Sequence, residues 1–306
     1  MSLYQKVRPT TFDGIVGTKN REVAASVRKL AESNDPPRAV MFFGDSGCGK
    51  TTLARILATA LGVSDNDFRE FNSASFRGID TAREIERTSH FRPIDGERRY
   101  WLLDEVHRWT RDSMEAMNKC LEDPPPHAYF ALCTTDPDKL LPTIRSRCVQ
   151  FRVYPLDEAD MVRLLHRVAA GEGASFPRAV LQKIAETSQG RPRVALNSLQ
   201  KMIADPDAGE AALAGVEQTE ARVLDLYQAM LRGQGWKAVS AVLGDLKKAG
   251  EDAEQVRRYL MACCSNELLR SDSERAALIM DQMVEPFYDS GFPGLVFSCY
   301  TVVRSD

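Results

Sequence analysis

The sequence predicts an α/β domain with a parallel sheet and flanking helices, followed by two helical domains. Short apolar runs alternate with longer amphipathic runs between residues 38 and 151, a pattern typical of strands joined by crossover helices. After Tyr154-Pro155 the strand-like runs give way to Ala, Leu, Arg and Glu with helical periodicity. A turn-rich break at residues 204–209 separates this part from a further helical stretch. We therefore expect domains at residues 1–154, 155–210 and 211–306.

Five short apolar runs are the expected strands of the sheet. They lie at residues 39–43, 68–71, 100–103, 129–133 and 148–151. Between the third and the fourth run, apolar residues recur at helical spacing, and this helix must end at residues 124–126 because consecutive prolines lack amide donors. Apolar residues with the same spacing between 161 and 184 predict the helices of a small domain of roughly 50 residues.

Composition limits the class of protein. The chain has 306 residues, of which 43% are hydrophobic, and its formal net charge is −3. A basic nucleic-acid coat is therefore excluded, and any DNA contact must come from a local surface. The first residues lack the apolar core of a signal peptide, and no run approaches the roughly 18 apolar residues of a membrane span, so we expect a cytosolic protein without membrane contact. The seven cysteines contain no Cys-x-x-Cys pair, which favours reduced thiols over a zinc site.

Residues 44–51 match the phosphate-binding loop G-x-x-x-x-G-K-[ST] in full, directly after an expected strand and before a helical run. The loop consists of Gly44, Asp45, Ser46, Gly47, Cys48, Gly49, Lys50 and Thr51. Its glycines let backbone amides close around phosphate, and the helix N-terminus adds partial positive charge. Lys50 would reach the β- and γ-phosphates, and Thr51 would offer its hydroxyl to Mg²⁺. We expect ATP and Mg²⁺ as ligands, with a chance glycine-rich turn as the alternative.

A second motif ends the third expected strand with two acids. Asp104 and Glu105 would emerge at the carboxyl edge of the sheet, where ligands of open α/β sheets bind. Asp104 would hold Mg²⁺ through water, and Glu105 would orient or deprotonate the attacking water. Alone, an Asp-Glu pair after a strand is usually a turn or a helix start, but the phosphate loop favours catalysis. Thr134 and Thr135 follow the next strand, where a hydroxyl either contacts the γ-phosphate or caps the strand.

Arginines at two further places have more than one interpretation. Arg147 opens the last expected strand, and its position alone does not distinguish a functional arginine from a solvated surface charge. A helix starting near Gly78 would place Arg83 and Arg87 on one face at i, i+4, with backbone amides pointing outward at its start. Glutamates lie close by, so a solvated helix is the alternative to a DNA contact.

Six segments of the sequence occur together in one known family. They are residues 6–17, 44–51, 104–107, 121–125, 134–140 and 146–148. Together they resemble the ATPase subunits of sliding-clamp loaders in the AAA+ superfamily, over about residues 4 to 204. The resemblance implies an α/β P-loop AAA+ domain, a small helical lid and a C-terminal all-helical collar that holds subunits in a ring. The last third is similar only in length and helical character.

The resemblance assigns roles to the ambiguous residues. It implies that Arg147 is an arginine finger acting in trans on ATP held by the neighbouring subunit, and that Thr134, with Thr135 as the alternative, is sensor 1. Residues 190–196 are similar to the family's Gly-x-x-Arg-x-Ala-Leu, which makes Arg193 the sensor 2 arginine. The remaining nucleotide-binding residues that the resemblance implies are Val7, Arg8, Val16 and Thr52.

Residues 72–83 resemble the corresponding segment of replication factor C small subunits. In that family the Asn, here Asn72, or a nearby polar group holds the catalytic Glu inactive until DNA arrives, and the next helix faces the duplex phosphates. The resemblance therefore implies contact with primer-template DNA through the phosphate backbone. The implied DNA-contacting residues are Arg77, Gly78, Ile79, Arg83, Arg87, Arg108 and Arg111.

One departure from the bacterial tau/gamma subunits concerns their four-cysteine zinc module. Only residues 62–67 separate the phosphate-loop helix from the next strand, so the compact form is more similar to replication factor C small subunits or phage loaders. We expect a DNA-stimulated ATPase in a pentameric ring or spiral that contains several copies of this chain, with other loader subunits and the sliding clamp as partners. Its place would be the bacterial or phage-infected cytosol, at the nucleoid. The alternatives are another AAA+ DNA machine, such as a helicase loader or fork-remodelling ATPase, and a non-hydrolysing ring subunit.

Overall fold

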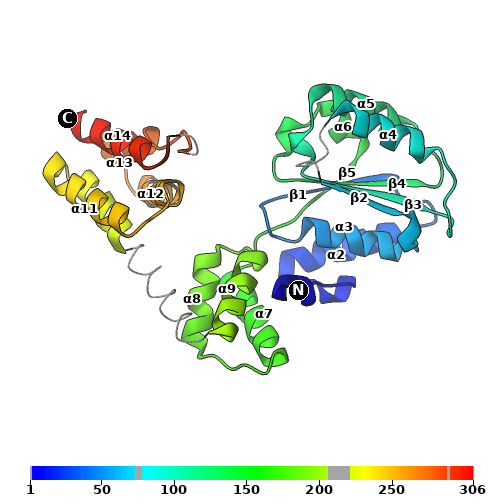
Figure 1. Cartoon of the computed structure of the whole chain (residues 1–306), viewed down its shortest axis with the longest axis horizontal. Helices are drawn as coiled ribbons and strands as arrows, with labels where there is room; N and C mark the ends of the chain where they lie inside the picture. Colours follow the sequence, from blue (N-terminus) through cyan, green and yellow to red (C-terminus); the bar gives the residue numbers. More distant parts are fainter. Residues whose placement is uncertain (1, 73–77, 206–220, 288–289, 306) are drawn as a thin grey trace. The chain divides into compact units, whose positions relative to one another are not determined.

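A computed structural model of the protein describes residues 2–72, 78–205, 221–287 and 290–305. The chain divides into two compact units, residues 1–206 and 207–306. The first unit holds a sheet with its covering helices and further helices at its two ends in sequence, and the second unit is helical (Figure 1). Among the described residues, no helix has the length and apolar character needed to span a bilayer.

The first unit is built around a five-stranded parallel sheet. Its strands are β1 Ala39–Phe43, β2 Phe68–Asn72, β3 Arg99–Asp104, β4 Ala128–Thr134 and β5 Val149–Arg152. They lie in the order β2-β3-β4-β1-β5, and every neighbouring pair is parallel. All five carboxyl ends therefore meet at one edge of the sheet, and the five predicted strands are confirmed.

Helices cover both faces of the sheet (Figure 1). On one face lie α2 Thr18–Ala31 and α3 Lys50–Ala60, and on the other lie α4 Ile79–Ser89, α5 Arg111–Glu122 and α6 Pro142–Arg147. Strand β3 supplies both cores, because Tyr100 and Leu102 join the first cluster and Trp101 and Leu103 join the second. The 3-10 turns in the described part of this unit include Phe12–Gly14, Asp65–Asp67, Val106–Arg108 and Pro137–Lys139.

Arg147 ends a helix rather than opening a strand, which corrects the placement expected from the sequence. Pro142 stands at the first position of α6, where its missing amide hydrogen costs nothing, and the helix continues to Arg147. Cys148 is extended, and β5 begins at Val149. The finger candidate therefore lies at a helix end just before the strand.

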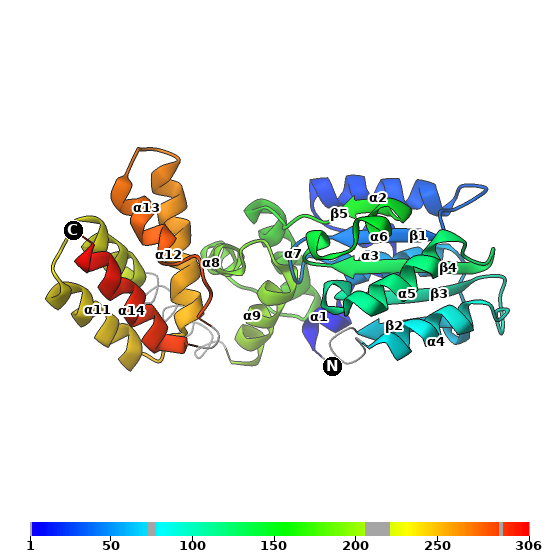
Figure 2. The same ribbon diagram turned by 90° about the horizontal axis from the view of Figure 1, so that it is seen from above.

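The lid helices pack in the same unit as the sheet. They are α7 Glu158–Gly171, α8 Arg178–Ser188 and α9 Pro192–Ala204. The short helix α1 Leu3–Lys6 lies beside α9 (Figure 2), where the backbone N–H of Leu3 donates to Gln200 Oε1 at 2.7 Å. The buried amide of Asn20 bonds both backbone groups of Tyr154, at 2.8 and 2.9 Å. The start of the lid is thereby held against α2.

The second unit consists of helices around one apolar core. They are residues 221–231, α11 Trp236–Lys248, α12 Ala253–Leu268, α13 Glu274–Asp281 and α14 Gly291–Arg304. Glu254 is buried, and its hydrogen bond with Arg257 lowers the pKa of its carboxyl to about 2, helped by the backbone N–H of Phe287 at 3.1 Å. The all-helical character predicted for this part is confirmed.

Candidate nucleotide site

The loop between β1 and α3 depends on its glycines. Gly44, Gly47 and Gly49 have φ angles of 142°, 79° and 109°, a region that residues with a side chain rarely adopt. At Gly44 an added Cβ would lie 2.1 Å from the carbonyl oxygen of Val153. The loop therefore requires glycine at this position both for its conformation and for the close approach of the β5 end.

The loop's cation and hydroxyl lie next to the first acid of β3. The Lys50 side chain is buried, and its Nζ donates to the carbonyl oxygens of Gly44 and Asp45 at 2.9 Å each. Thr51 Oγ1 donates to Asp104 Oδ2 at 3.0 Å. A hydroxyl and a carboxylate are oxygen ligands of the kind that Mg²⁺ prefers, so these residues fit the ion. Among the described residues, no group of three or more His, Cys, Asp or Glu is placed to hold a metal.

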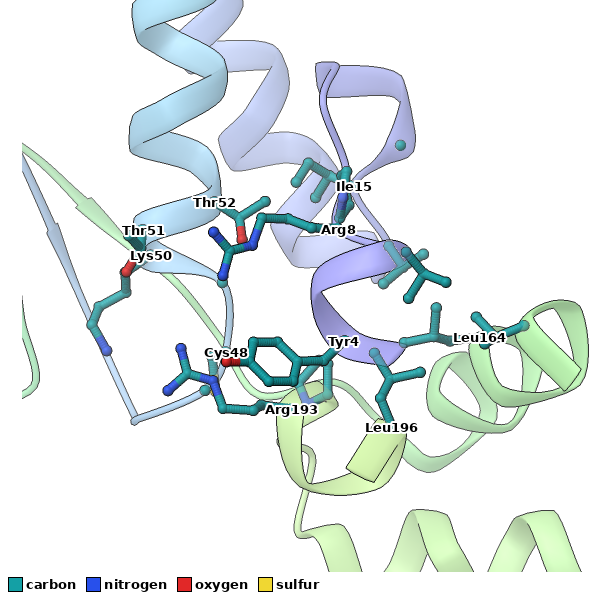
Figure 3. A pocket seen from close by; sticks show the side chains of 18 of the residues that line it. Tyr4, Arg8, Ile15, Cys48, Lys50, Thr51, Thr52, Leu164, Arg193 and Leu196 are labelled. Carbon is teal, nitrogen blue, oxygen red and sulfur yellow. The ribbon is translucent and has the colours of Figure 1, made fainter. Parts of the chain in front are cut away.

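A cavity of about 530 Å³ opens beside the loop, between the N-terminal segment and the lid (Figure 3). Ile15, Leu164 and Leu196 lie at one end of the cavity, and the guanidinium groups of Arg8 and Arg193 lie on the side of the phosphate loop. The predicted site residues that line the cavity are Val7, Arg8, Val16, Ser46, Gly47, Cys48, Gly49, Lys50, Thr51, Thr52, Asn72, Asp104, Glu105 and Arg193. The cavity thus combines an apolar end with a cationic one.

Eleven lining residues were not predicted from the sequence, among them Tyr4, Leu164 and Val168. Tyr4 lies under the Arg193 guanidinium, whose Cζ is 5.4 Å from the ring centroid (Figure 3). Leu164 and Val168, one turn apart on α7, line the cavity from the lid. Their helical spacing predicted a buried face, but the spacing is the same whether that face meets the lid core or a ligand pocket. No motif marks Tyr4.

Glu105 has an unusual backbone. Its φ of 56° and ψ of 40° are left-handed, and Gln189 is the other non-glycine residue with positive φ in the described part of the chain. Such a conformation costs of order 1–3 kcal/mol and is concentrated at functional sites. Asn72 ends β2 opposite Asp104 in the β2–β3 register, so it lies beside the two acids.

Thr134 is buried beside His107 and does not line the cavity. Its hydroxyl is fully buried, lies 3.2 Å from His107 Nδ1 and accepts the backbone N–H of Asp136 at 3.0 Å. Its carbonyl oxygen accepts the backbone N–H of Gly44 at 3.3 Å, which ties β4 to the start of the loop. Thr134 is not among the residues that line the cavity, and Thr135 is half-buried. The assignment of sensor 1 to one of them stays a prediction.

Arg147 lies outside the cavity of its own chain. Its guanidinium pairs with Glu122 Oε2 at 3.0 Å and donates to the carbonyl oxygen of Thr143 at 2.9 Å. Glu122 ends α5, so the proline-rich helix end and the Ser-Arg-Cys segment meet at one corner. An arginine that acts on a neighbouring subunit needs a surface position of this kind.

The predicted DNA-contacting residues lie on exposed parts of the first unit, with one outside the described residues. Gly78 is the N-cap of α4, Ile79 is its first residue, and Arg83 and Arg87 are exposed along it. Arg108 is exposed in the turn after β3, and Arg111 is paired with Glu115 at 3.1 Å. Arg77 lies outside the described residues.

Three bacterial proteins illustrate the similarity in sequence. The chain is 33% identical over 227 residues to the gamma/tau subunit of DNA polymerase III from Mycobacterium tuberculosis, covering 67% of this chain and 39% of that protein. It is 32% identical over 267 residues to the tau subunit of DNA polymerase III from Escherichia coli, covering 78% of this chain and 41% of that protein. It is also 32% identical over 219 residues to the gamma subunit of DNA polymerase III from Buchnera aphidicola subsp. Schizaphis graminum, covering 65% of this chain and 60% of that protein. The chain thus spans less than two thirds of the length of these relatives.

The family described as "DNA polymerase III, delta subunit" matches residues 63–157. The fold resembles the Holliday junction branch migration motor RuvB of Thermotoga maritima, with a TM-score of 0.58 and 19% identity over 78% of this chain and 85% of that one. At this identity the likeness shows the fold alone. Together with the phosphate loop and the two acids, these similarities in sequence support an AAA+ clamp-loader subunit that resembles the tau and gamma subunits.

Proposed function

We propose that this chain binds ATP with Mg²⁺ and hydrolyses it as a subunit of a sliding-clamp loader. The observation that carries the proposal is the convergence of the phosphate loop, the Thr51–Asp104 pair and Glu105 on one cavity. Arg193 adds a cation from the lid to the same cavity. Positive groups around the phosphates, an oxygen pair for Mg²⁺ and a carboxylate for the water are the parts that phosphoryl transfer needs.

Each part of the cavity has a role in this proposal. The apolar end formed by Ile15, Leu164 and Leu196, with Val7 and Val16, would take the adenine ring. Lys50 would exchange its two carbonyl partners for phosphate oxygens. Thr51 and Asp104 would hold Mg²⁺, which neutralises phosphate charge when it is bound. Glu105 would orient the attacking water, and Asn72 at the neighbouring strand end would restrain Glu105 until DNA binds.

Assembly would complete the site. Arg147 of the neighbouring subunit would reach the ATP in trans, so a lone chain would hydrolyse ATP slowly. The second unit would act as the collar of a ring or spiral, five subunits in all with several copies of this chain, together with other loader subunits. ATP-driven assembly would open the clamp and place it on primer-template DNA, and DNA-stimulated hydrolysis would release it. This work would take place at replicating DNA in a bacterial cytosol.

The decisive experiment is an ATPase assay of the complete complex, with and without clamp and primer-template DNA. We expect each to stimulate turnover and the two effects to combine. Glu105→Gln is the matched variant, because it keeps nucleotide binding and loses turnover. Stimulation by DNA without any effect of the clamp would favour another AAA+ DNA machine. Nucleotide binding without turnover in the complete complex would favour a structural ring subunit.

The exposed face of α4 is proposed to contact the DNA backbone. Replacing Arg83 or Arg87 with Ala should weaken DNA binding by the complex and reduce the slope of log K against log salt by roughly one per lost phosphate contact. Arg178→Ala, an exposed arginine of the lid outside the proposed contacts, is the control. A salt slope equal to the wild-type slope in both α4 variants would assign this face to solvent.

A further inference from the structure

His107 lies between two residues of the proposed site. Its side chain is 12% exposed and belongs to the turn Val106–Arg108 that follows the acids of β3. Its Nδ1 is 3.2 Å from Thr134 Oγ1, and its Nε2 is 3.5 Å from Glu105 Oε2. One imidazole therefore meets the hydroxyl at the end of β4 with one nitrogen and the carboxylate after β3 with the other.

The Glu105 carboxylate favours one tautomer of this ring, and the Thr134 hydroxyl can complete it. Thr134 Oγ1 already accepts the backbone N–H of Asp136, and a hydroxyl has a single hydrogen to donate. When that hydrogen goes to His107 Nδ1, a neutral ring carries its own hydrogen on Nε2, which faces the Glu105 carboxylate. The other tautomer would turn the Nε2 lone pair toward a carboxylate oxygen, which is repulsive.

The surroundings of His107 favour the neutral ring. Burial lowers the pKa of His107, the Glu105 carboxylate opposes this shift, and Arg108 and Lys139 add to it, with Asp136 opposing it weakly. A neutral imidazole has one donor nitrogen and one acceptor nitrogen, whereas the charged ring has two donors. Only the neutral ring can accept from Thr134 and donate toward Glu105 at the same time.

We propose that His107 is a positioning residue. The Thr134 hydroxyl donates its hydrogen to Nδ1 of His107, and the Nε2–H of His107 then orients the Glu105 carboxylate. This inference rests on the proposed function, in which Glu105 orients the attacking water. The Nε2–H of His107 holds one carboxylate oxygen, which leaves the other for the water. The left-handed backbone at Glu105 places its side chain within reach of the ring only two residues further along the chain. The carbonyl oxygen of Thr134 accepts the backbone N–H of Gly44, which connects this threonine to the phosphate loop.

The tautomer can be measured without any activity. Long-range ¹H–¹⁵N spectra of the histidine-labelled full chain contain signals from four rings, and the His107 signals are those lost in His107→Gln. We expect the Nε2–H tautomer to dominate at neutral pH. Thr134→Val should remove this preference, whereas Thr59→Val, at an exposed position of α3, should keep it. A dominant Nδ1–H form, a charged ring, or a preference unchanged in Thr134→Val would overturn the inference.

Turnover separates orientation from folding. Gln carries an amide N–H near the position of Nε2, whereas Asn reaches only the position of Nδ1. In the complete complex, His107→Asn should lower kcat about tenfold, the effect of one lost hydrogen bond of about 1.4 kcal/mol, with nucleotide affinity unchanged. His107→Gln should restore most of this loss, although both variants replace the ring by a smaller amide side chain. Equal losses in the two variants would indicate a packing role and overturn the positioning role.

The outcomes distinguish this inference from the proposed function. A complete complex that hydrolyses no ATP would contradict the proposed function and, with it, any catalytic effect of His107. A complex that hydrolyses ATP with the wild-type kcat in His107→Asn would contradict the positioning role alone.

Discussion

The phosphate-loop edge of the sheet and the corner where α5 and α6 end hold their cations in different ways. Lys50 is buried and bonded to two backbone carbonyl oxygens, whereas Arg147 pairs with Glu122, whose side chain is 64% exposed. Backbone partners are set by the fold of one chain, while a surface ion pair exchanges readily with another partner. The difference fits the proposed function, in which one half of the site is built within the chain and Arg147 would complete the site of a neighbouring subunit.

The largest effect is expected at the corner. Arg147→Ala should reduce turnover of the assembled complex by about 10³–10⁵, the range for an arginine finger, because the transition-state charge loses its partner. Nucleotide binding by the single chain should be unchanged, since Arg147 lies outside its own cavity. Arg145→Ala, in the same helix and paired with Asp138, is the control. Unchanged turnover in Arg147→Ala would show that Arg147 does not act on ATP held by a neighbouring subunit.

The second-largest loss of turnover is expected at Lys50 of the phosphate loop. Lys50→Ala should lower turnover by about 10²–10³, the usual cost of removing one donor from developing charge, and should also weaken nucleotide binding by the single chain. Titration with a fluorescent ATP analogue measures the binding. Lys29→Ala, an exposed lysine of α2, is the matched variant. Intact binding and turnover in Lys50→Ala would show that the cavity is not the ATP site.

A smaller effect, on stability, tests whether the loop is built by the chain itself. Gly44→Ala should lower the free energy of unfolding by about 2–3 kcal/mol, because the methyl group meets the Val153 carbonyl and the φ of 142° is strained. Gly62→Ala isolates the strain, since Gly62 also has positive φ and its added Cβ would meet no atom within 4 Å. Denaturant unfolding measures both. Equal losses would mean that the contact with β5 contributes nothing.

The smallest effect concerns the ion pair at the corner. Glu122→Gln should lower turnover of the assembled complex by no more than about fivefold, because an exposed pair is worth up to about 1 kcal/mol. The guanidinium would then sample other directions before it meets the neighbour. Asp138→Asn, which releases Arg145 in the same way, should leave turnover unchanged. A loss as large as that of Arg147→Ala would show that Glu122 is needed to hold the finger.

The fold was largely predictable because its signals are local. Strands β1, β3 and β4 are largely apolar runs between polar segments, because both of their faces are buried, whereas β2 and β5 at the sheet edges combine apolar and polar residues. The end of α5 at Glu122 follows from the prolines that come after it. The placement of Arg147 was wrong by one element, because Pro142 starts a short helix whose apolar spacing is too brief to be recognised.

The candidate site was predictable where a motif joins neighbours in sequence. The loop, Asp104 and Glu105 follow strand ends, and parallel strands bring their carboxyl ends to one edge. Tyr4, Leu164 and Val168 come from segments far apart in the chain, and only packing of the lid against the N-terminal segment brings them to the cavity. The direction of the Thr134 hydroxyl likewise depends on His107, which belongs to a different strand end.

The sequence by itself determined the succession of strands and helices along the chain, the phosphate loop, and the two acids at the end of β3. Periodicity, glycine positions and motif spacing are properties of short segments. The tertiary structure decided which of the two threonines faces His107, that Arg147 is held by Glu122, and that α7 and α9 line the cavity. These three facts rest on contacts between residues distant in the chain. Their distances follow from how the elements pack, which no local pattern encodes.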